Sequence, residues 1–257
     1  MIRNKLASLL ADRNLKISRV ANDTDLSRNT ITSTAQNDTK MIQLDTINEL
    51  CQYLSISPAD FFEYLNFDLS SSASYVPASF KDTLGGFFSN AKVENITCDL
   101  FITQSYNQQS TGLRSRTFDL TVKQTSSVSL PIVGDSEGTE IHFEVMLGHL
   151  DDNEEFEKEE KDFNAVWSEL TPGFNATISK DIMTTVSNEI RAGIDSQIDT
   201  SENDDVRKKS VDWSLTKFLF NFSFRNAFDS THTDSNPLAD DSSAKPIIEI
   251  QTDELPF

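Results

Sequence analysis

Apolar positions between residues 1 and 65 recur at the spacing of amphipathic helices. This pattern predicts five short helices, each with one apolar face. Their expected ranges are 2–13, a short helix around 17–21, 27–35, 44–54, and a last one from Pro58 to about residue 65. Ser27 is a good N-cap for the third helix, and Pro58 stands at the first helical position of the fifth. We therefore expect a compact all-α domain at residues 1–67.

The next stretch, residues 68–79, reads DLSSSASYVPAS and shows no clear period. Serine-rich segments of this kind are typical of linkers. We predict a linker here, between the helical domain and a C-terminal domain.

Beyond residue 80 the period of the apolar residues changes to two. Strict alternation predicts half-buried strands of an antiparallel sheet. The expected strands are 96–102, 118–122, 139–147, 217–225 and 247–250. Helical spacing predicts two helices between them, at 154–170 and 181–198, and polar composition predicts exposed loops at 199–209 and 229–245. The sequence therefore predicts an α+β fold overall, with a C-terminal α+β domain at residues 80–257.

Composition narrows the class of protein. The 257 residues are 37% hydrophobic and include 18 Phe, which suffices for a packed core. No apolar run approaches the roughly 18 residues of a membrane span, and the N-terminus lacks the features of a secretory signal. We expect a soluble cytoplasmic protein with no membrane partner. The two cysteines, Cys51 and Cys98, lie in apolar-periodic segments, which favours buried, reduced thiols over a disulfide or a metal site.

The charge is unevenly distributed. The net charge is −19, but residues 1–40 hold seven Lys/Arg against four Asp and carry +3. Residues 41–67 carry −4, which leaves −18 for residues 68–257. This asymmetry fits contact with a polyanion through a small N-terminal module, with the acidic bulk facing away.

Residues 15–37 are the most informative stretch. They predict two short helices across a tight turn, the second of which begins Ser27-Arg28-Asn29-Thr30. The major groove of duplex DNA accepts such a helix, where Arg pairs bidentately with guanine and Asn with adenine. Arg28 and Asn29 are therefore candidate base-reading residues, against the alternative that Arg28 is only a solvated surface charge.

Residues 1–65 resemble the Cro/repressor-type (XRE-like) helix-turn-helix family of bacteria and phages. The matching segments are 16–21 (KISRVA), 24–31 (TDLSRNTI), 44–54 (LDTINELCQYL) and 57–62 (SPADFF). Two positions depart from the family: Asp25, where a left-handed Gly is usual in the turn, and Ile17, where many members have Gln. These departures concern the details of backbone contact rather than the fold.

The resemblance implies roles residue by residue. The base-reading positions fall on Arg28, Asn29, Thr30, Thr32 and Ser33. Flanking residues are candidate phosphate contacts: Lys16, Ser18, Arg19, Gln36, Asn37 and Lys40. Val20, Leu26 and Ile31 are assigned to the core.

Enzymatic interpretations are weaker. Gly134-Asp135-Ser136 and Ala192-Gly193 superficially echo self-cleaving repressors, but the order is wrong and no lysine follows at a suitable place. Glu140, His142 and Glu144 share a strand face close to His149, and we interpret them as a solvated face rather than a metal site. We expect no enzyme activity, no metal and no cofactor.

The sequence thus predicts a bacterial, cytoplasmic transcriptional regulator, nucleoid-associated when it is bound to double-stranded operator DNA. By family analogy it is a phage or prophage repressor that binds as a dimer or higher oligomer, since one such helix reads few base pairs. Residues 181–198 and 217–225 are candidates for a self-association contact or, alternatively, for the core. The alternative function is a protein-interaction module whose acidic C-terminal domain binds a protein partner such as an antirepressor or toxin.

Overall fold

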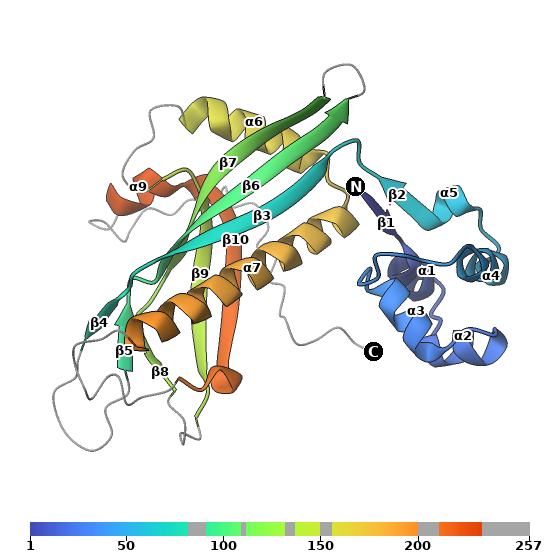
Figure 1. Ribbon diagram of the computed structural model, residues 1–257, viewed down its shortest axis with the longest axis horizontal. Helices are drawn as coiled ribbons and strands as arrows, with labels where there is room; N and C mark the ends of the chain where they lie inside the picture. The colour runs from blue at the N-terminus through green and yellow to red at the C-terminus, as the bar shows by residue number, and fades with distance from the viewer. Residues whose placement is uncertain (82–90, 109–111, 132–136, 150–155, 200–210, 233–257) are drawn as a thin grey trace.

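The computed structural model describes residues 1–81, 91–108, 112–131, 137–149, 156–199 and 211–232. Within them, buried apolar side chains form two separate clusters. One lies among the N-terminal helices and the other inside a sheet domain that begins near residue 65. Figure 1 shows the small helical domain beside the larger one, in which long strands run next to a long helix. The predicted α+β class is confirmed.

The N-terminal domain contains the five expected helices. They are α1 (Leu6–Asp12), α2 (Ile17–Asp23), α3 (Arg28–Ala35), α4 (Leu44–Leu54) and α5 (Pro58–Phe61). Sequence signals explain where two of them begin. Ser27 caps α3 by accepting a hydrogen bond from the Thr30 amide at 3.1 Å. Ser57 and Asp60 form a capping box on α5, and the hydrogen bonds from Ser57 hold the pKa of Asp60 below its ordinary value.

The outer ends of the first and fifth predicted helices are wrong. Residues Ile2–Asn4 form strand β1, which pairs antiparallel with β2 (Phe62–Tyr64). Ile2 fits the helical spacing of Leu6 and Leu10, yet it is 70% exposed whereas those two are buried. The extended conformation is held instead by pairing with a segment at the other end of the domain, which no local period reveals.

The predicted linker at 68–79 is also corrected. Residues Asp68–Val76 form β3, which pairs along its whole length with β6 (Thr97–Gln108). On β3, Ser70, Ser72 and Ser74 are exposed, while the alternate Ser71 hydroxyl donates to Asp181 at 2.7 Å. Because serine stands on both faces, the strand carries little of the apolar alternation that identifies a strand in a sequence.

Two sheets form the C-terminal domain. The large sheet has the order β10-β9-β7-β6-β3, with β7 at Gly112–Gln124, β9 at Thr139–Leu147 and β10 at Thr216–Asn226. Its pairs are antiparallel except β10 with β9, which run parallel. A small sheet has the order β4-β5-β8, from Ser79–Lys81, Ala91–Glu94 and Val128–Leu130. The strands expected at 96–102, 118–122, 139–147 and 217–225 are all present.

Two helices pack against the large sheet. Helix α6 (Phe156–Ser168) and helix α7 (Pro172–Asp199) correspond to the two predicted helices, α7 beginning earlier than expected. A row of α7 side chains is buried with the inward strand residues: Ile178, Ile182, Val186, Ile190, Ile194 and Ile198. Gly193 permits close packing, since a Cβ there would lie 2.1 Å from the Tyr75 ring of β3.

This packing decides one open alternative. The apolar residues of 181–198 are in the core, and Phe218 and Phe220 of β10 are buried with them. They are therefore not available as a self-association contact.

Some predicted elements lie outside the described residues. They are the strand at 247–250, residues 200–209 of the first predicted loop, and most of the second loop. The second loop's first residues instead belong to α9 (Ala227–His232), which follows β10. The short 3-10 helix η1 (Trp213–Leu215) precedes that strand.

In the part of the chain that the structure describes, no helix is both long and apolar enough to cross a membrane.

Candidate nucleic-acid interface

A short turn joins α2 to α3 and fixes their relative position. The Thr24 hydroxyl donates to the Val20 carbonyl at 2.7 Å and so ends α2. The Asp25 amide donates to Glu49 Oε1 of α4 at 2.6 Å. Asp25 does not adopt the left-handed conformation that its place in the turn suggested. The hydrogen bond to Glu49 therefore holds this turn without a glycine.

Helix α3 has one buried and one exposed face. Ile31 is fully buried, and Thr34 and Ala35 on the following turn are nearly so. Arg28 and Asn29 lie in the first turn on the exposed side. Neither has a hydrogen bond or ion pair within the described residues. The first turn of α3 thus presents an Arg fork and an Asn amide to solvent, both free to bind.

The three hydroxyl residues proposed as readers differ from one another. The Thr30 hydroxyl is 2.9 Å from the Ser27 hydroxyl, and the Ser33 hydroxyl donates to the Thr30 carbonyl at 3.2 Å. Thr32 is half-buried and has no such bond among the residues described. A base edge would therefore compete with internal hydrogen bonds at Thr30 and Ser33, but not at Thr32.

The proposed phosphate contacts after α3 differ in whether their side chains are free or already bonded within the protein. Gln36 and Lys40 are exposed. Asn37 is engaged inside the protein: its Oδ1 accepts from the Asn4 amide at 2.8 Å and from Asn4 Nδ2 at 2.7 Å, and its Nδ2 donates to the Asn4 carbonyl. Asn37 also has a left-handed φ of 56°. Asn37 therefore ties the end of α3 to β1, and a phosphate would compete with these internal hydrogen bonds.

The beginning of α2 forms the other flank. Lys16, Ser18 and Arg19 line a shallow hollow of about 360 Å³ together with Asn14 and Asn22. Sequence reasoning missed the two asparagines. The available signal for Asn22 was its spacing, four residues after Ser18 on the same side of α2. Amide and ammonium groups gathered in this way are suitable donors to phosphate oxygens.

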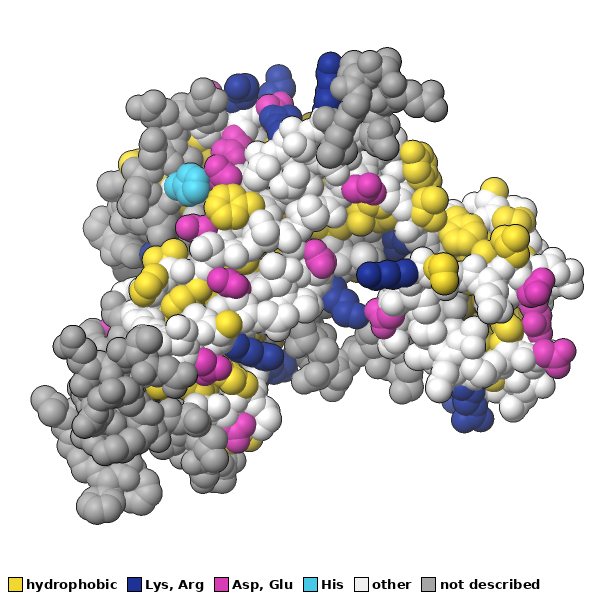
Figure 2. Space-filling view, in the orientation of Figure 1, with side chains coloured by type: hydrophobic (Ala, Val, Ile, Leu, Met, Phe, Trp, Pro, Cys, Tyr) yellow, Lys and Arg dark blue, Asp and Glu magenta, His cyan; other side chains and the backbone are white. Residues whose placement is uncertain are grey.

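Asp23 reduces the positive charge of this flank and links α2 to α4. It pairs with Arg19 at 3.5 Å, where Arg19 remains 72% exposed. Its Oδ2 also accepts from the Tyr53 hydroxyl of α4 at 2.9 Å, which raises the pKa of Tyr53 above its ordinary value. This network joins α2 to α4. Figure 2 shows Lys/Arg side chains at the lower end of the helical domain, where Figure 1 places α2 and α3.

The residues assigned to the core are confirmed. Val20 and Ile31 are fully buried, and Leu26 packs against their cluster. Ile17, the position where many family members have Gln, also packs against this core. Its side chain therefore supports the start of α2 rather than a phosphate contact.

Alternative sites in the sheet domain can be compared with this interface. Glu144 is held by Arg225 in a bidentate pair at 2.7 and 2.6 Å, and His149 lies 3.3 Å from Asp119. No group of three potential metal ligands occurs among the residues described. Residues 134–136 lie outside them, and Ala192-Gly193 is inside α7. Cys51 and Cys98 are buried free thiols, as expected.

Comparison with known proteins identifies the N-terminal region. The family Cro/C1-type HTH DNA-binding domain matches residues 5–66, which include all five helices described above. No curated protein and no solved structure matches the chain. The match agrees with the exposed first turn of α3 and its braced partner α2. The chain is therefore a DNA-binding regulator whose residues 5–66 form a Cro/C1-type helix-turn-helix domain.

Proposed function

We propose that this regulator reads a specific operator sequence through α3 and acts as a repressor of phage or prophage type. The observation that carries the proposal is the pair Arg28 and Asn29, adjacent, exposed and without partners among the described residues in the first turn of α3. The N-terminal residues of a recognition helix are the ones that contact base edges. Arg28 would read guanine and Asn29 adenine, with Thr32 next along the helix.

The phosphate contacts would come from both flanks of α3. Lys16, Ser18 and Arg19 at the start of α2 are supported by the hollow that they share with Asn22. Gln36 and Lys40 are supported by their exposure. Such contacts set the register of the protein on the duplex but carry no sequence information themselves. Thr30 and Ser33 remain proposed readers whose internal hydrogen bonds would have to rearrange.

Repression would follow from steric occlusion of a promoter by the bound protein. Two copies on half-sites about one helical turn apart would raise affinity and selectivity through effective concentration. The apolar side chains of α7 and the Phe218 and Phe220 rings of β10 are buried in the core, so they would not form the contact between copies. A fragment starting at residue 80 is unsuitable for testing association, since it lacks edge strand β3. Sedimentation of the full chain at micromolar concentration is the suitable measurement.

The experiment is selection of bound DNA sequences by the full chain, followed by gel-shift titration of the selected site. We expect Arg28→Ala and Asn29→Ala each to weaken specific binding by about 1–3 kcal/mol, or roughly fivefold to 150-fold, and to relax sequence preference at one position. Non-specific binding should change much less.

Matched controls come from residues that are already engaged. Arg225→Ala removes an exposed arginine that is paired with Glu144, and Gln52→Ala removes an exposed α4 amide that bonds Asn48. Neither should alter the preferred sequence. If Arg28→Ala and Asn29→Ala leave specific binding intact, the assignment of reading residues is wrong. Weak, salt-dependent binding with no sequence preference would instead favour the protein-interaction module.

A further inference from the structure

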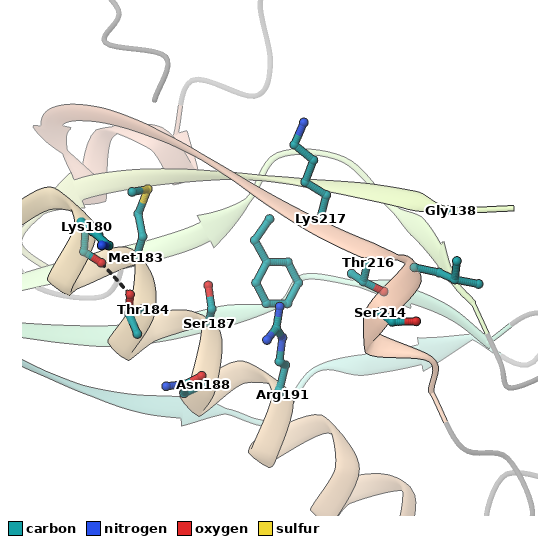
Figure 3. Close-up of a pocket in the computed structure, with 12 residues that line it drawn as sticks. Gly138, Lys180, Met183, Thr184, Ser187, Asn188, Arg191, Ser214, Thr216 and Lys217 are labelled. Carbon is teal, nitrogen blue, oxygen red and sulfur yellow. Dashed lines mark hydrogen bonds between the residues drawn. The ribbon is translucent and has the colours of Figure 1, made fainter. Parts of the chain in front are cut away.

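A pocket of about 630 Å³ lies between the middle of α7 and the start of β10, outside the helix-turn-helix domain. Figure 3 shows its lining, in which polar side chains of α7 face the η1–β10 segment. The polar groups include Thr184, Ser187, Asn188, Ser214 and Thr216. A volume of a few hundred cubic ångströms with a few polar groups is typical of small-molecule sites.

Arg191 is the central feature of this pocket. Its guanidinium carbon lies 5.1 Å from the centre of the Phe218 ring and 6.0 Å from that of Trp213. Its Nε is enclosed and has no hydrogen-bond partner among the residues that the structure describes. No carboxylate pairs with Arg191 in the described ranges, and the nearby Asp195 carboxylate is engaged by Trp213 Nε1 at 3.0 Å. A half-buried arginine that lines a pocket and has no carboxylate partner is suited to bind an anion.

The charge around the pocket is opposite to that of the chain. The whole protein carries −19, yet the described lining residues include Lys180 and Arg191 and no carboxylate. Lys217 also lines the pocket, but its ammonium pairs with Glu140 at 3.7 Å and points away from α7 in Figure 3. Within the described lining, the uncompensated positive charge therefore belongs to Lys180 and Arg191, both on α7.

We propose that this pocket binds a small hydroxylated organic anion, whose phosphate or carboxylate group is held by Arg191. The planar guanidinium matches either group in a bidentate fashion, and the rings of Trp213 and Phe218 hold it in place. Lys180 adds positive charge at the pocket's edge, and the Ser187 hydroxyl can bond a ligand hydroxyl. The Ser214 hydroxyl donates to Asp212 Oδ1, so it can accept a hydrogen bond from the ligand. Binding itself does not depend on the DNA-binding function.

Helix α7 also connects this pocket to the helix-turn-helix domain. Just before its first turn, the Thr171 hydroxyl donates to Glu63 Oε2 of β2 at 2.8 Å. Glu63 also pairs with Arg3 of β1, and Arg3 lies 5.8 Å from the Phe174 ring of α7. A ligand that shifts α7 therefore acts on the base of the DNA-binding domain. This effector role rests on the proposed function, unlike the binding site.

Isothermal titration of the full chain with inorganic phosphate, glucose 6-phosphate and citrate tests the site without DNA. We expect saturable binding of at least one of the two organic probes, and binding at least about tenfold weaker in Arg191→Gln, because a charged hydrogen-bond partner is lost. Lys180→Gln should weaken binding less. The phosphate and citrate arms distinguish a phosphate site from a carboxylate site.

Arg225→Gln is the control, since it removes an arginine on β10 that lies outside the pocket lining. It should bind the probe as the wild type does. Circular dichroism checks folding, and if Arg191→Gln does not fold, Lys180→Gln and Ser187→Ala carry the test. Absence of binding by every organic probe, or equal binding by the wild type and the folded pocket variants, overturns the proposal.

Gel shifts of a selected operator with and without the bound probe then test the effector role. Unchanged DNA affinity would reject the effector role but would leave the binding site in place.

Discussion

Two exposed arginines, one in each domain, stand in different environments. Arg28 on α3 has no ion pair among the described residues, and it stands in a segment that carries net positive charge. Arg225 on β10 is held bidentately by Glu144, in a domain that is strongly acidic. An arginine already bound to a carboxylate has no fork left for a base or a phosphate. Arg28 therefore keeps a guanidinium that can bind a base or a phosphate, whereas the guanidinium of Arg225 is occupied.

The hydrophobic cores of the two domains also differ, in size. The helical domain is built on nine buried apolar residues, from Leu6 to Phe61, whereas the sheet domain buries a much larger set drawn from its strands and from α6 and α7. Small domains bury a smaller fraction of their surface and are correspondingly marginal. Helix α3, the proposed reading helix, thus stands on the smaller core, which we expect to be the weaker one, and the pocket with Arg191 stands on the larger core.

The largest expected effect comes from truncating the small core. Leu50 of α4 is fully buried, so Leu50→Ala should destabilise the helical domain by about 2–5 kcal/mol through lost burial and a cavity. Both tryptophans, Trp167 and Trp213, belong to the sheet domain, so tryptophan fluorescence reports that domain alone. Urea titration should show the far-ultraviolet circular dichroism losing an early component while the fluorescence midpoint stays near that of the wild type.

Leu44 supplies the control on the same helix. It is 81% exposed, so the same change, Leu44→Ala, should shift stability by less than about 0.5 kcal/mol. A fluorescence midpoint that moves together with the circular dichroism in Leu50→Ala would mean that the two cores unfold as one unit. The comparison between a weaker and a stronger core would then fail.

Local patterns predicted most of the helical domain because the information is local there. The spacing of Leu6 and Leu10, the cap at Ser27 and the proline at 58 each act within a few residues. The errors concern pairs that are distant in the chain. β1 depends on β2 at the far end of the helical domain, and β3 depends on β6 and on α7, where Tyr75 bonds Gln197. No period within a single segment reports such partners.

The candidate site follows the same rule. Arg28 and Asn29 could be proposed as base-reading residues from the sequence because they sit in the first turn of a capped helix. The role of Asn37 could not, because it depends on the distant Asn4. Arg191 looked like one more polar residue among the apolar positions of α7. Only the fold brings Trp213 and Phe218 beside it and leaves its Nε without a partner.

The buried thiols give the next prediction, which compares the two cores by pH. Burial raises the pKa of Cys98 in the sheet domain from 9.0 to about 12, and Glu189 adds to the shift. Below pH 9 the thiol is protonated in both states, so it has no effect on stability. Between pH 9 and 12 the unfolded chain releases this proton while the folded protein keeps it, so Cys98 makes stability fall as pH rises. The contribution is about 1.4 kcal/mol at pH 10.

Urea titrations followed by tryptophan fluorescence at pH 8 and pH 10 isolate this contribution. The decrease between the two pH values should be smaller in Cys98→Ala than in the wild type, whatever the variant's stability at pH 8. Cys51 lies in the other core, where burial followed by the charge of Asp60 also raises its pKa. Cys51→Ala should therefore leave the fluorescence result unchanged. An equal decrease in Cys98→Ala and the wild type would contradict the shift.

The smallest expected effect compares two lysines, one in each domain, that have no ion pair within the described ranges. Lys16 lines the hollow at the start of α2, and Lys180 lies on α7 in the sheet domain. A lysine that neutralises one phosphate releases condensed counterions, so Lys16→Ala should reduce the salt dependence of log K for DNA binding by about 0.9. The reduction should be the same for specific and unrelated DNA, because phosphate contacts carry no sequence information. Lys180→Ala removes the same charge from α7, away from α3, so it should leave the slope unchanged. Equal slopes for the two variants would show that Lys16 is an ordinary surface charge that does not contact a phosphate.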